Sequence, residues 1–436
     1  MLRINLVLFG LTALFWLAGV FFFPFELNSR GIQHQIFLLT GLAAWFLWAE
    51  ALVIAARPRW IERVAGEPLD RLMGAHRKLG WGMAAASLLH VAAPVFVAFL
   101  PVEQVSGMAE RPVMGSLAEA VWIWLHPLGA LTGILLTLYL IRVIWRDARR
   151  ASGKLDWTRW EKSHRAWAWV YLFFILHAVR LMKETELAMP LGWLNVAVTL
   201  LGAWAAVSII RRRPGSALRA MGEVVSVQRS EGEFVLVAKS ALARSVRPGE
   251  FAYLSLPCDR EDPHPFTVVA ADPGKGTVSF WIKEAGDWTR ALAARKPGSE
   301  LEIEGPWGSF LPVWEAGGPQ SWIAGGLGLA PFIAWLEAAA ARRRSTGEAP
   351  RATLWWFVRH AGREPFLPEA KRLAEAAGIE LRVFETGDDH RGADPALVIP
   401  PGTERVEVCG SRAFALAFRR RWKELGGQGA FRSEAC

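Results

Sequence analysis

Cysteine is scarce in this sequence: Cys258, Cys409 and Cys436 are the only three among 436 residues. No two of them form a CxxC pair, which excludes the common cysteine-based zinc motifs. The composition is 52% hydrophobic overall but uneven, because Arg, Glu, Gly and Pro become plentiful only after about residue 211. The sequence therefore predicts a membrane half joined to a soluble half rather than one soluble globule.

The first half contains six apolar runs long enough to cross a bilayer, because about 20 residues at about 1.5 Å each span its ~30 Å core. The predicted spans are approximately 4–25, 32–56, 72–100, 117–142, 163–182 and 189–210. The first run is too long and too apolar for a removable signal peptide, and no small-residue cleavage site follows it. We therefore expect it to remain as a membrane helix.

Lysine and arginine are few in the loops on one side of these spans, which hold only Arg30, Arg111, Arg180 and Lys183. The opposite loops, 57–78 and 142–165, are rich in both. By the positive-inside rule, both termini and the soluble half are cytoplasmic, in a multi-pass protein of the cell (inner) membrane. In that reducing compartment we expect free thiols rather than disulfides. The net charge of +9 then belongs largely to the inner membrane surface and indicates no nucleic-acid partner.

Two of the spans carry a histidine at each end. The third reads HRKLGWGMAAASLLH from His76 to His90, and the fifth reads HRAWAWVYLFFILH from His164 to His177. In each, the two histidines lie about 20 Å apart along the axis. Because both spans enter from the same side, His76 is expected level with His164, and His90 level with His177.

Facing imidazoles can supply both axial ligands of a haem iron. The alternative is that these are helix-end histidines bonded to backbone carbonyls or water, which explains four of them in two matching layers less well. The spacings differ, since ideal geometry returns His90 to within about 40° of His76 but leaves His177 about 140° from His164. The fifth helix therefore needs a π-bulge or kink, or the two haems are rotated relative to each other.

The His-x13-His and His-x12-His spacings resemble the ferric reductase transmembrane domain of the NADPH oxidase and ferric reductase superfamily. That resemblance implies a six-helix bundle with two b-type haems, the inner held by His76 and His164 and the outer by His90 and His177. His34 and His126, near the outer ends of spans two and four, are expected to be polar groups packed at the interface; positioning of an acceptor is the alternative.

From about residue 216 the pattern changes to short alternating strands with Pro-Gly turns, which predicts a small antiparallel barrel. This part holds HPFT, comprising His264, Pro265, Phe266 and Thr267, and then a GDWT sequence, comprising Gly286, Asp287, Trp288 and Thr289. GDWT precedes a predicted helix, whose N-terminus would favour a diphosphate, with Lys283 adding positive charge. HPFT alone could be a turn in any β protein.

Together these motifs resemble the FAD domain of the ferredoxin-reductase type. The resemblance implies that His264 to Thr267 line the isoalloxazine and ribityl chain, and that Gly286 to Thr289 hold the pyrophosphate. GPWGSF, at 305–310, is similar to the family's segment linking the two lobes.

From about residue 320 strands and helices alternate, which predicts a parallel α/β sheet. The first strand leads into Gly325, Gly326 and Gly328, with Pro331 in the first helical turn, an arrangement that lets a backbone approach a pyrophosphate. Later strand ends carry further candidates for a nicotinamide nucleotide site by the same resemblance: Arg359, His360, Cys409, Gly410 and Ser411. For Cys409 the alternative is a buried small side chain. Arg359 and nearby Arg363 favour NADPH, with NADH possible, because NAD sites usually place an acidic residue there.

The C-terminus departs from the family pattern, because Cys436 stands where an aromatic residue commonly covers the flavin. Since a thin lid leaves the flavin open, we expect turnover to be limited little by ring displacement. Changing Cys436 to Phe should then slow hydride transfer, as followed by flavin reduction. An unchanged rate would contradict this.

These motifs predict three domains: a six-helix haem domain at 1–213, an FAD-binding β-barrel at 214–316 and an NAD(P)H-binding α/β domain at 317–436. The expected function is electron transfer from cytosolic NADPH, through FAD and two b-type haems, to external oxygen, giving superoxide. A ferric-chelate or quinone reductase with the same path is the alternative. A non-catalytic haem anchor or redox sensor is a third hypothesis, although an anchor needs no flavin or nucleotide motifs.

Overall fold

The computed structural model forms two compact units, Met1–Ala217 and Leu218–Cys436. It describes residues 2–104, 157–180, 182, 184–211, 215, 218–230, 232–257, 263–315, 318–386, 398–400, 402–427 and 429–435, with single residues 131, 133, 135, 138, 139, 142, 143, 145 and 146. The predicted fourth span, His126, Cys258 and Cys436 lie wholly or mostly outside these residues.

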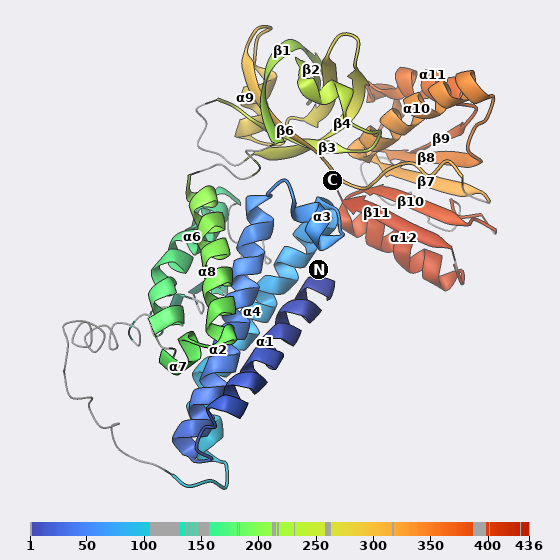
Figure 1. The fold of residues 1–436 in the computed structure, drawn as a ribbon. Helices are drawn as coiled ribbons and strands as arrows, with labels where there is room; N and C mark the ends of the chain where they lie inside the picture. Colours follow the sequence, from blue (N-terminus) through green and yellow to red (C-terminus); the bar gives the residue numbers. More distant parts are fainter. Residues whose placement is uncertain are drawn as a thin grey trace. The chain divides into compact units, whose positions relative to one another are not determined.

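The first unit is helical (Figure 1). Its described helices are α1 (Leu2–Phe22), α2 (Ser29–Ala56), α3 (Ile61–Ala65), α4 (Leu69–Ala98), α6 (Trp157–Arg180), α7 (Glu184–Leu187) and α8 (Pro190–Ile210). α2 packs against both α4 and α8. Tyr171 of α6 stacks on Trp45 of α2 with ring centroids 4.0 Å apart, and the Trp45 indole N–H donates to Thr199 of α8. These contacts join three long helices around one buried aromatic group.

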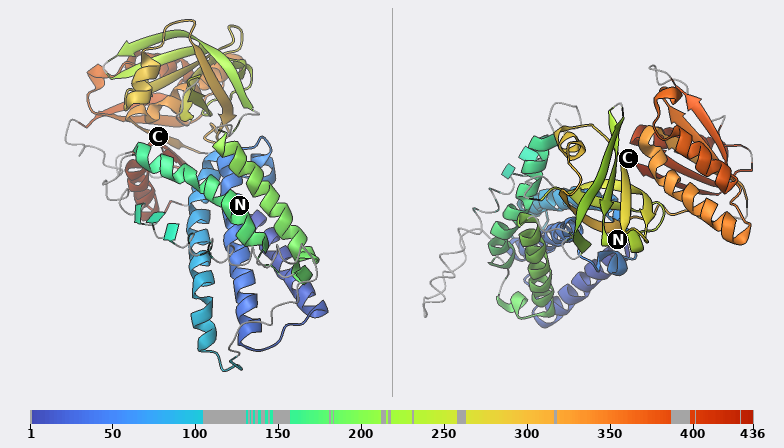
Figure 2. Two further views of the ribbon diagram at one scale, coloured as in Figure 1. Left: turned by 90° about the vertical axis from the view of Figure 1, so that its left-hand side faces the viewer. Right: turned by 90° about the horizontal axis from the view of Figure 1, so that it is seen from above.

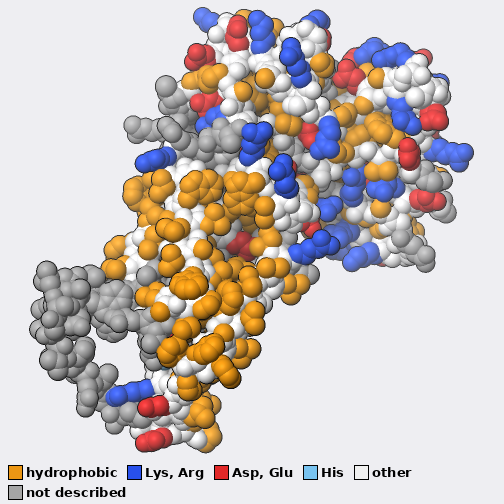
Figure 3. All heavy atoms as spheres, viewed as in Figure 1, with side chains coloured by type: hydrophobic (Ala, Val, Ile, Leu, Met, Phe, Trp, Pro, Cys, Tyr) orange, Lys and Arg blue, Asp and Glu red, His pale blue; other side chains and the backbone are white. Residues whose placement is uncertain are grey.

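The outer surface of this unit is apolar. Hydrophobic side chains cover its helices on the face shown in Figure 3, and Phe21 and Leu200 are 80% and 65% exposed. Of the described helices, Arg3–Phe22, Ser29–Ala56 and Pro190–Ile210 are long and apolar enough to cross a membrane. Such continuous exposed apolar surface is expected where lipid is the solvent. The unit is therefore a membrane domain, while the predicted total of six spans stays a prediction.

The second unit opens with a closed barrel (Figure 2). Its strands run in the order β1-β2-β5-β4-β3-β6. The strands are β1 (Arg219–Ser230), β2 (Glu233–Lys239), β3 (Phe251–Ser255), β4 (His264–Asp272), β5 (Thr277–Lys283) and β6 (Glu300–Trp307). All neighbouring pairs are antiparallel. Helix α9 (Asp287–Ala293) follows β5, and the 3-10 turn η2 (Ala241–Arg244) follows β2. Inward residues such as Phe234 and Phe280 form the barrel core.

A five-stranded parallel sheet follows, in the order β11-β10-β7-β8-β9. Its strands are β7 (Gln320–Gly325), β8 (Ala352–Val358), β9 (Glu380–Glu385), β10 (Arg405–Gly410) and β11 (Ala430–Ala435). One face packs on α10 (Ala330–Thr346) and α11 (Leu367–Ala377), and the other on α12 (Arg412–Glu424) (Figure 1). The turns η3 (Gly326–Leu329) and η4 (Ala361–Arg363) follow β7 and β8. The predicted antiparallel barrel and parallel α/β sheet are thus confirmed.

Candidate cofactor sites

The four histidines at the ends of the third and fifth spans meet in two pairs. His76 and His90 lie on α4, and His164 and His177 on α6. The ring centroids of His76 and His164 are 6.0 Å apart, and those of His90 and His177 are 6.1 Å apart. The structure therefore brings together the partners that the spacing predicted, while their role as metal ligands stays a prediction.

Both α4 histidines are oriented by backbone carbonyls of α2. Nδ1 of His76 lies 3.0 Å from the Ala51 carbonyl oxygen, and Nδ1 of His90 lies 3.1 Å from that of Phe37. Because a carbonyl can only accept, Nδ1 carries the proton and donates it, which leaves Nε2 with a lone pair for a metal. This is the arrangement usually found behind a ligating histidine.

The separation of the rings fits a shared metal ion. Two metal–imidazole bonds of about 2 Å, together with the half-widths of the two rings, place the ring centres about 6 Å apart. Small residues lie beside the outer pair, since a Cβ on Gly41 or Gly133 would come within 3.2 or 2.9 Å of Cε1 of His90 or His177. The donor set and its surroundings thus fit a pair of haem irons.

The unequal histidine spacing is accommodated without a π-bulge. α6 is α-helical from Trp157 to Arg180, with no π-helical residue among them. The π-bulge considered from the sequence is therefore absent. Ideal geometry then leaves His164 and His177 about 140° apart around α6, so a kink in α6 or a rotation between the two predicted haems stays a prediction.

The other described membrane histidine, His34, contacts a glutamate side chain. Its Nε2 lies 2.5 Å from Oε1 of Glu186 in α7, and both side chains are largely buried. This contact joins α2 to the segment between α6 and α8. It agrees with a packing role for His34, whereas a role in positioning an acceptor stays a prediction.

In the barrel, the two predicted FAD motifs meet at one tryptophan. His264 to Thr267 open β4 and pair with Leu254 to Phe251 of β3. The Trp288 ring lies 4.3 Å from the His264 ring and stacks with Phe266 at 5.8 Å between centroids. Residues at least 22 positions apart in the sequence are therefore in contact, as expected if both motifs belong to one flavin site. Contacts with the flavin itself stay a prediction.

The predicted pyrophosphate cradle is partly occupied by the protein itself. The Thr289 hydroxyl accepts hydrogen bonds from the backbone N–H groups of Ala285 and Gly286, each 3.0 Å long. Asp287 forms an ion pair with Arg290 on its own helix. Because α9 has only seven residues, its dipole is a weak attraction for a phosphate. Sequence reasoning missed that Thr289 caps the helix.

Lys283, the basic residue predicted beside the pyrophosphate, belongs to a charged cluster. Burial and the nearby charge of Glu233 raise the pKa of Glu364 to about 7. The positive charge of Lys283 lowers it in part. Burial also raises the pKa of Glu233, whose carboxylate accepts from the Trp281 indole N–H at 2.8 Å. Trp281 stacks on Phe366 at 4.2 Å, so the cluster lies where the barrel packs against the segment around Glu364.

This cluster predicts a pH dependence of stability. Folded Glu364 keeps its proton up to a pH of about 7, whereas the unfolded carboxyl releases it near 4.5, so stability falls as pH rises between these values. Glu364→Gln should therefore gain stability relative to the parent protein between about pH 5 and about pH 8, on the order of 1 kcal/mol after discounting for solvent screening. Thermal unfolding at the two pH values measures the difference, and a parallel response of both proteins would contradict it.

The glycine-rich turn after β7 packs directly on the end of β10. A Cβ on Gly328 would lie 2.1 Å from the Cys409 carbonyl oxygen, and one on Gly410 would lie 2.9 Å from the Phe414 ring. Gly326 has a positive φ of 54°. Pro331 lies in the first turn of α10. The predicted nucleotide residues of the two strands thus form one continuous edge at the carboxyl ends of the sheet.

The remaining nucleotide candidates lie around this edge. Cys409 is fully buried in the core beneath α10. This is what the alternative interpretation predicts, in which Cys409 is a small buried side chain. Ser411 caps α12 by accepting from the Phe414 N–H. Arg359 is exposed after β8, and His360 lies 3.4 Å from Glu385 at the end of β9. Sequence reasoning missed this acidic neighbour because it comes from a different strand.

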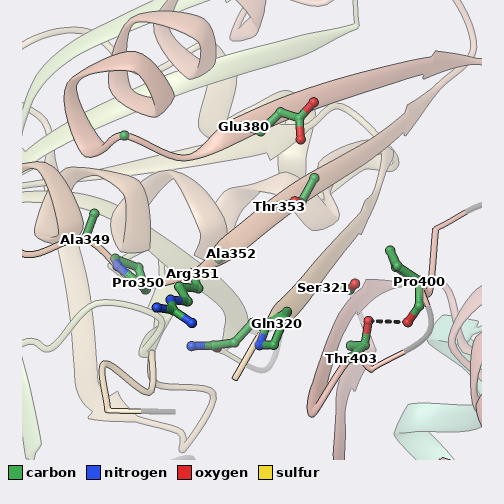
Figure 4. A pocket seen from close by; sticks show the side chains of 12 residues that line it. Gln320, Ser321, Ala349, Pro350, Arg351, Ala352, Thr353, Glu380, Pro400 and Thr403 are labelled. Atoms are coloured by element: carbon green, nitrogen blue, oxygen red, sulfur yellow. Dashed lines mark hydrogen bonds between the residues drawn. The ribbon is translucent and has the colours of Figure 1, made fainter. Parts of the chain in front are cut away.

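A shallow pocket of about 480 Å³ opens at the opposite edge of the sheet (Figure 4). Gln320, Ala352 and Glu380, the first residues of β7, β8 and β9, contribute to its lining. In α/β sheets ligands bind at the carboxyl ends of the strands, so this pocket has no part in the nucleotide site.

The chain is similar to known proteins over parts of its length. Residues 40–175 match the family model described as ferric reductase like transmembrane component. Human NADPH oxidase 5 is 25% identical over 248 residues, which cover 54% of this chain and 29% of that protein. Sulfhydrogenase 1 subunit gamma of Pyrococcus furiosus is 36% identical over 174 residues, covering 38% of this chain and 59% of the subunit. The chain thus spans less than two thirds of either relative.

Among solved structures, a ferredoxin NADP+ reductase from Neisseria gonorrhoeae with bound FAD and NADP matches 50% of this chain and 98% of its own. Its TM-score is 0.42 and its sequence identity is 17%. The described residues form a helical membrane unit, followed by an antiparallel barrel and a parallel α/β sheet. The chain is thus similar to the NADPH oxidase and ferric reductase superfamily over part of its length.

Proposed function

We propose that this protein moves electrons from cytosolic NADPH, through FAD and two b-type haems, to molecular oxygen on the outer side of the cell membrane, releasing superoxide. The observation that carries the proposal is the pairing of four histidines, with ring centroids 6.0 and 6.1 Å apart in the two pairs. In each pair, the histidine of α4 is oriented by a backbone carbonyl of α2. A helix that needed its histidines only for packing would not require two such layers.

The proposal assigns each group a place on the chain. Haem supplies one-electron chemistry and FAD converts a hydride into single electrons. His76 and His164 would hold the inner haem, and His90 and His177 the outer. The barrel would hold FAD at β4 and α9, and the carboxyl edge of the sheet would hold NADPH. The division into domains at residues 213 and 316, and the cytoplasmic position of both termini, belong to the same proposal.

On this proposal the side chains orient and hold the cofactors. The Ala51 and Phe37 carbonyls fix the imidazoles of α4, and Trp288 fixes His264 and Phe266 in one wall of the barrel. Exposed Arg359 supports NADPH over NADH, because a guanidinium suits a 2′-phosphate. No side chain has to act as a nucleophile or a general base.

The second candidate is a ferric-chelate reductase with the same electron path, favoured by the family model that matches residues 40–175. One experiment separates the candidates. Purified full-length protein loaded with haem and FAD is given NADPH, and oxygen uptake and superoxide are followed with and without a ferric chelate. Superoxide that disappears with superoxide dismutase selects the oxidase, and activity only with added iron selects the reductase. No haem reduction at all sinks both and leaves the haem anchor.

A further inference from the structure

A fully buried carboxylate lies in the middle of the parallel sheet. Glu407 of β10 is 0% exposed, and its carboxylate accepts hydrogen bonds from Nε of Arg432 at 2.8 and 3.0 Å and from Arg405 at 3.2 Å. Arg432 lies directly opposite Glu407 on β11, and Arg405 precedes it by two residues on β10. A buried ion pair stabilises a fold little compared with an apolar pair, so what matters here is the geometry that this pair fixes.

Arg432 also reaches out of the sheet to the segment that leaves the barrel. Its Nη2 donates to the Leu311 carbonyl at 2.7 Å and its Nη1 donates to the Ser309 carbonyl at 3.4 Å. The guanidinium carbon lies 5.6 Å from the centre of the Phe310 ring. One planar guanidinium therefore holds β10, β11 and residues 309–311 together, a geometry that the single ammonium of lysine cannot reproduce.

The same segment is held from its other side. The Phe310 ring stacks on Trp335 of α10 at 4.8 Å, and the Trp335 indole N–H donates to the Phe310 carbonyl at 3.1 Å. The barrel turn at Gly249 packs there too, since a Cβ on Gly249 would lie 2.0 Å from that carbonyl oxygen. The barrel and the sheet are thus fixed to each other at Phe310, between α10 and Arg432.

Arg432 is close in sequence to the nucleotide edge. β11 runs parallel to β10, and its last residue, Ala435, pairs with Gly410. A change in the position of Arg432 would therefore move both the edge of the sheet and its attachment to the barrel. Hydride transfer depends steeply on the distance between donor and acceptor, since a shift of about 1 Å can cost about 100-fold in rate.

We infer that Arg432 is a positioning residue for hydride transfer, which sets the barrel against the nucleotide edge by joining Glu407 to the carbonyls of Ser309 and Leu311. This inference rests on the proposed function, with flavin in the barrel and a nicotinamide nucleotide at the edge of the sheet.

The test compares Arg432→Lys with Arg405→Lys in the full-length protein containing FAD. Both substitutions disturb the same buried carboxylate, but only Arg432 reaches the barrel segment. The rate of flavin reduction by saturating NADPH is measured without oxygen. It is expressed per bound flavin, so that loss of FAD from a variant does not lower the measured rate. We expect Arg432→Lys to slow it about 10- to 100-fold with little change in the NADPH KM, and Arg405→Lys to leave it within about twofold. With NADPH deuterated at the transferred position, the isotope effect should be larger in Arg432→Lys than in the parent protein.

Two results would overturn the inference: an unchanged rate per flavin in Arg432→Lys, or an equal loss in Arg405→Lys. If Arg432→Lys does not retain FAD, Glu407→Gln is measured instead, because it weakens the hold on Arg432 while keeping its shape; a rate equal to the parent then overturns the inference as well. Failure of the proposed function looks different, since neither NADPH nor NADH would then reduce the flavin of the parent protein.

Discussion

On the proposed function, changing His90 to alanine is expected to remove one of the two haems from the protein. His90 and His177 face each other at 6.1 Å, and no other histidine of the described residues lies in this pair. An iron that loses one of two axial imidazoles loses its low-spin spectrum, and the remaining ligand binds a porphyrin weakly. The haem content per chain should fall by about half, together with the Soret and α bands. NADPH-driven reduction of the external acceptor should fall by more than about 100-fold, because second-shell changes alone cost about 10- to 100-fold.

His164→Ala should remove the other haem and leave that of His90 and His177. His34→Gln is the matched control, because His34 is a membrane histidine of α2 that pairs with Glu186 rather than with a histidine. The glutamine amide can still donate to Glu186, and both haems should stay. Haem extraction and the reduced-minus-oxidised spectrum measure all three. Two haems of unchanged spectrum in both His90→Ala and His164→Ala would mean that these histidines are not ligands.

The pairing of the histidines could be predicted from sequence, but their orientation could not. Two spans that enter from the same side, each with two histidines about 20 Å apart, have few ways to satisfy them. The groups that orient His76 and His90 are backbone carbonyls of Ala51 and Phe37, and a carbonyl has no sequence signature. The position of Gly41 beside His90 could not be predicted either, since glycine is frequent in membrane helices.

In the second unit, alternating hydrophobicity and Pro-Gly turns were enough to predict the barrel and the parallel sheet. Contacts that depend on strand register were not. Glu407 and Arg432 are 25 positions apart and meet only because β10 and β11 align in parallel. Thr289 was assigned to the diphosphate because it belongs to the GDWT motif before a helix, yet its hydroxyl caps α9. Local motifs identify the region of a site, while hydrogen-bond partners decide which atoms remain for a ligand.

Gly328→Ala is expected to disrupt the nucleotide edge of the sheet. The new Cβ would lie 2.1 Å from the Cys409 carbonyl oxygen, 2.5 Å from its carbon and 2.9 Å from the Gly410 nitrogen. These are backbone atoms of a central strand, so no side-chain rotation relieves the overlap, and the turn must separate from β10. Overpacking of this kind typically costs about 1–3 kcal/mol, and a clash with backbone places this case at about 3 kcal/mol or more. NADP+ affinity should fall roughly 10- to 100-fold, since the turn and Gly410 would no longer form one edge.

Gly326→Ala distinguishes this clash from a general loss of glycine freedom in the same turn. Gly326 has a φ of 54° but no atom within 4 Å of an added Cβ, so only the left-handed backbone opposes alanine, at about 1–2 kcal/mol. Hydrogen exchange of the β10 amides in the full-length protein reports the separation directly. Exchange should accelerate strongly in Gly328→Ala and little in Gly326→Ala. Equal, slow exchange in both variants would show that the turn does not depend on close approach to Cys409, because a real overlap of backbone atoms cannot leave the hydrogen bonds of β10 undisturbed.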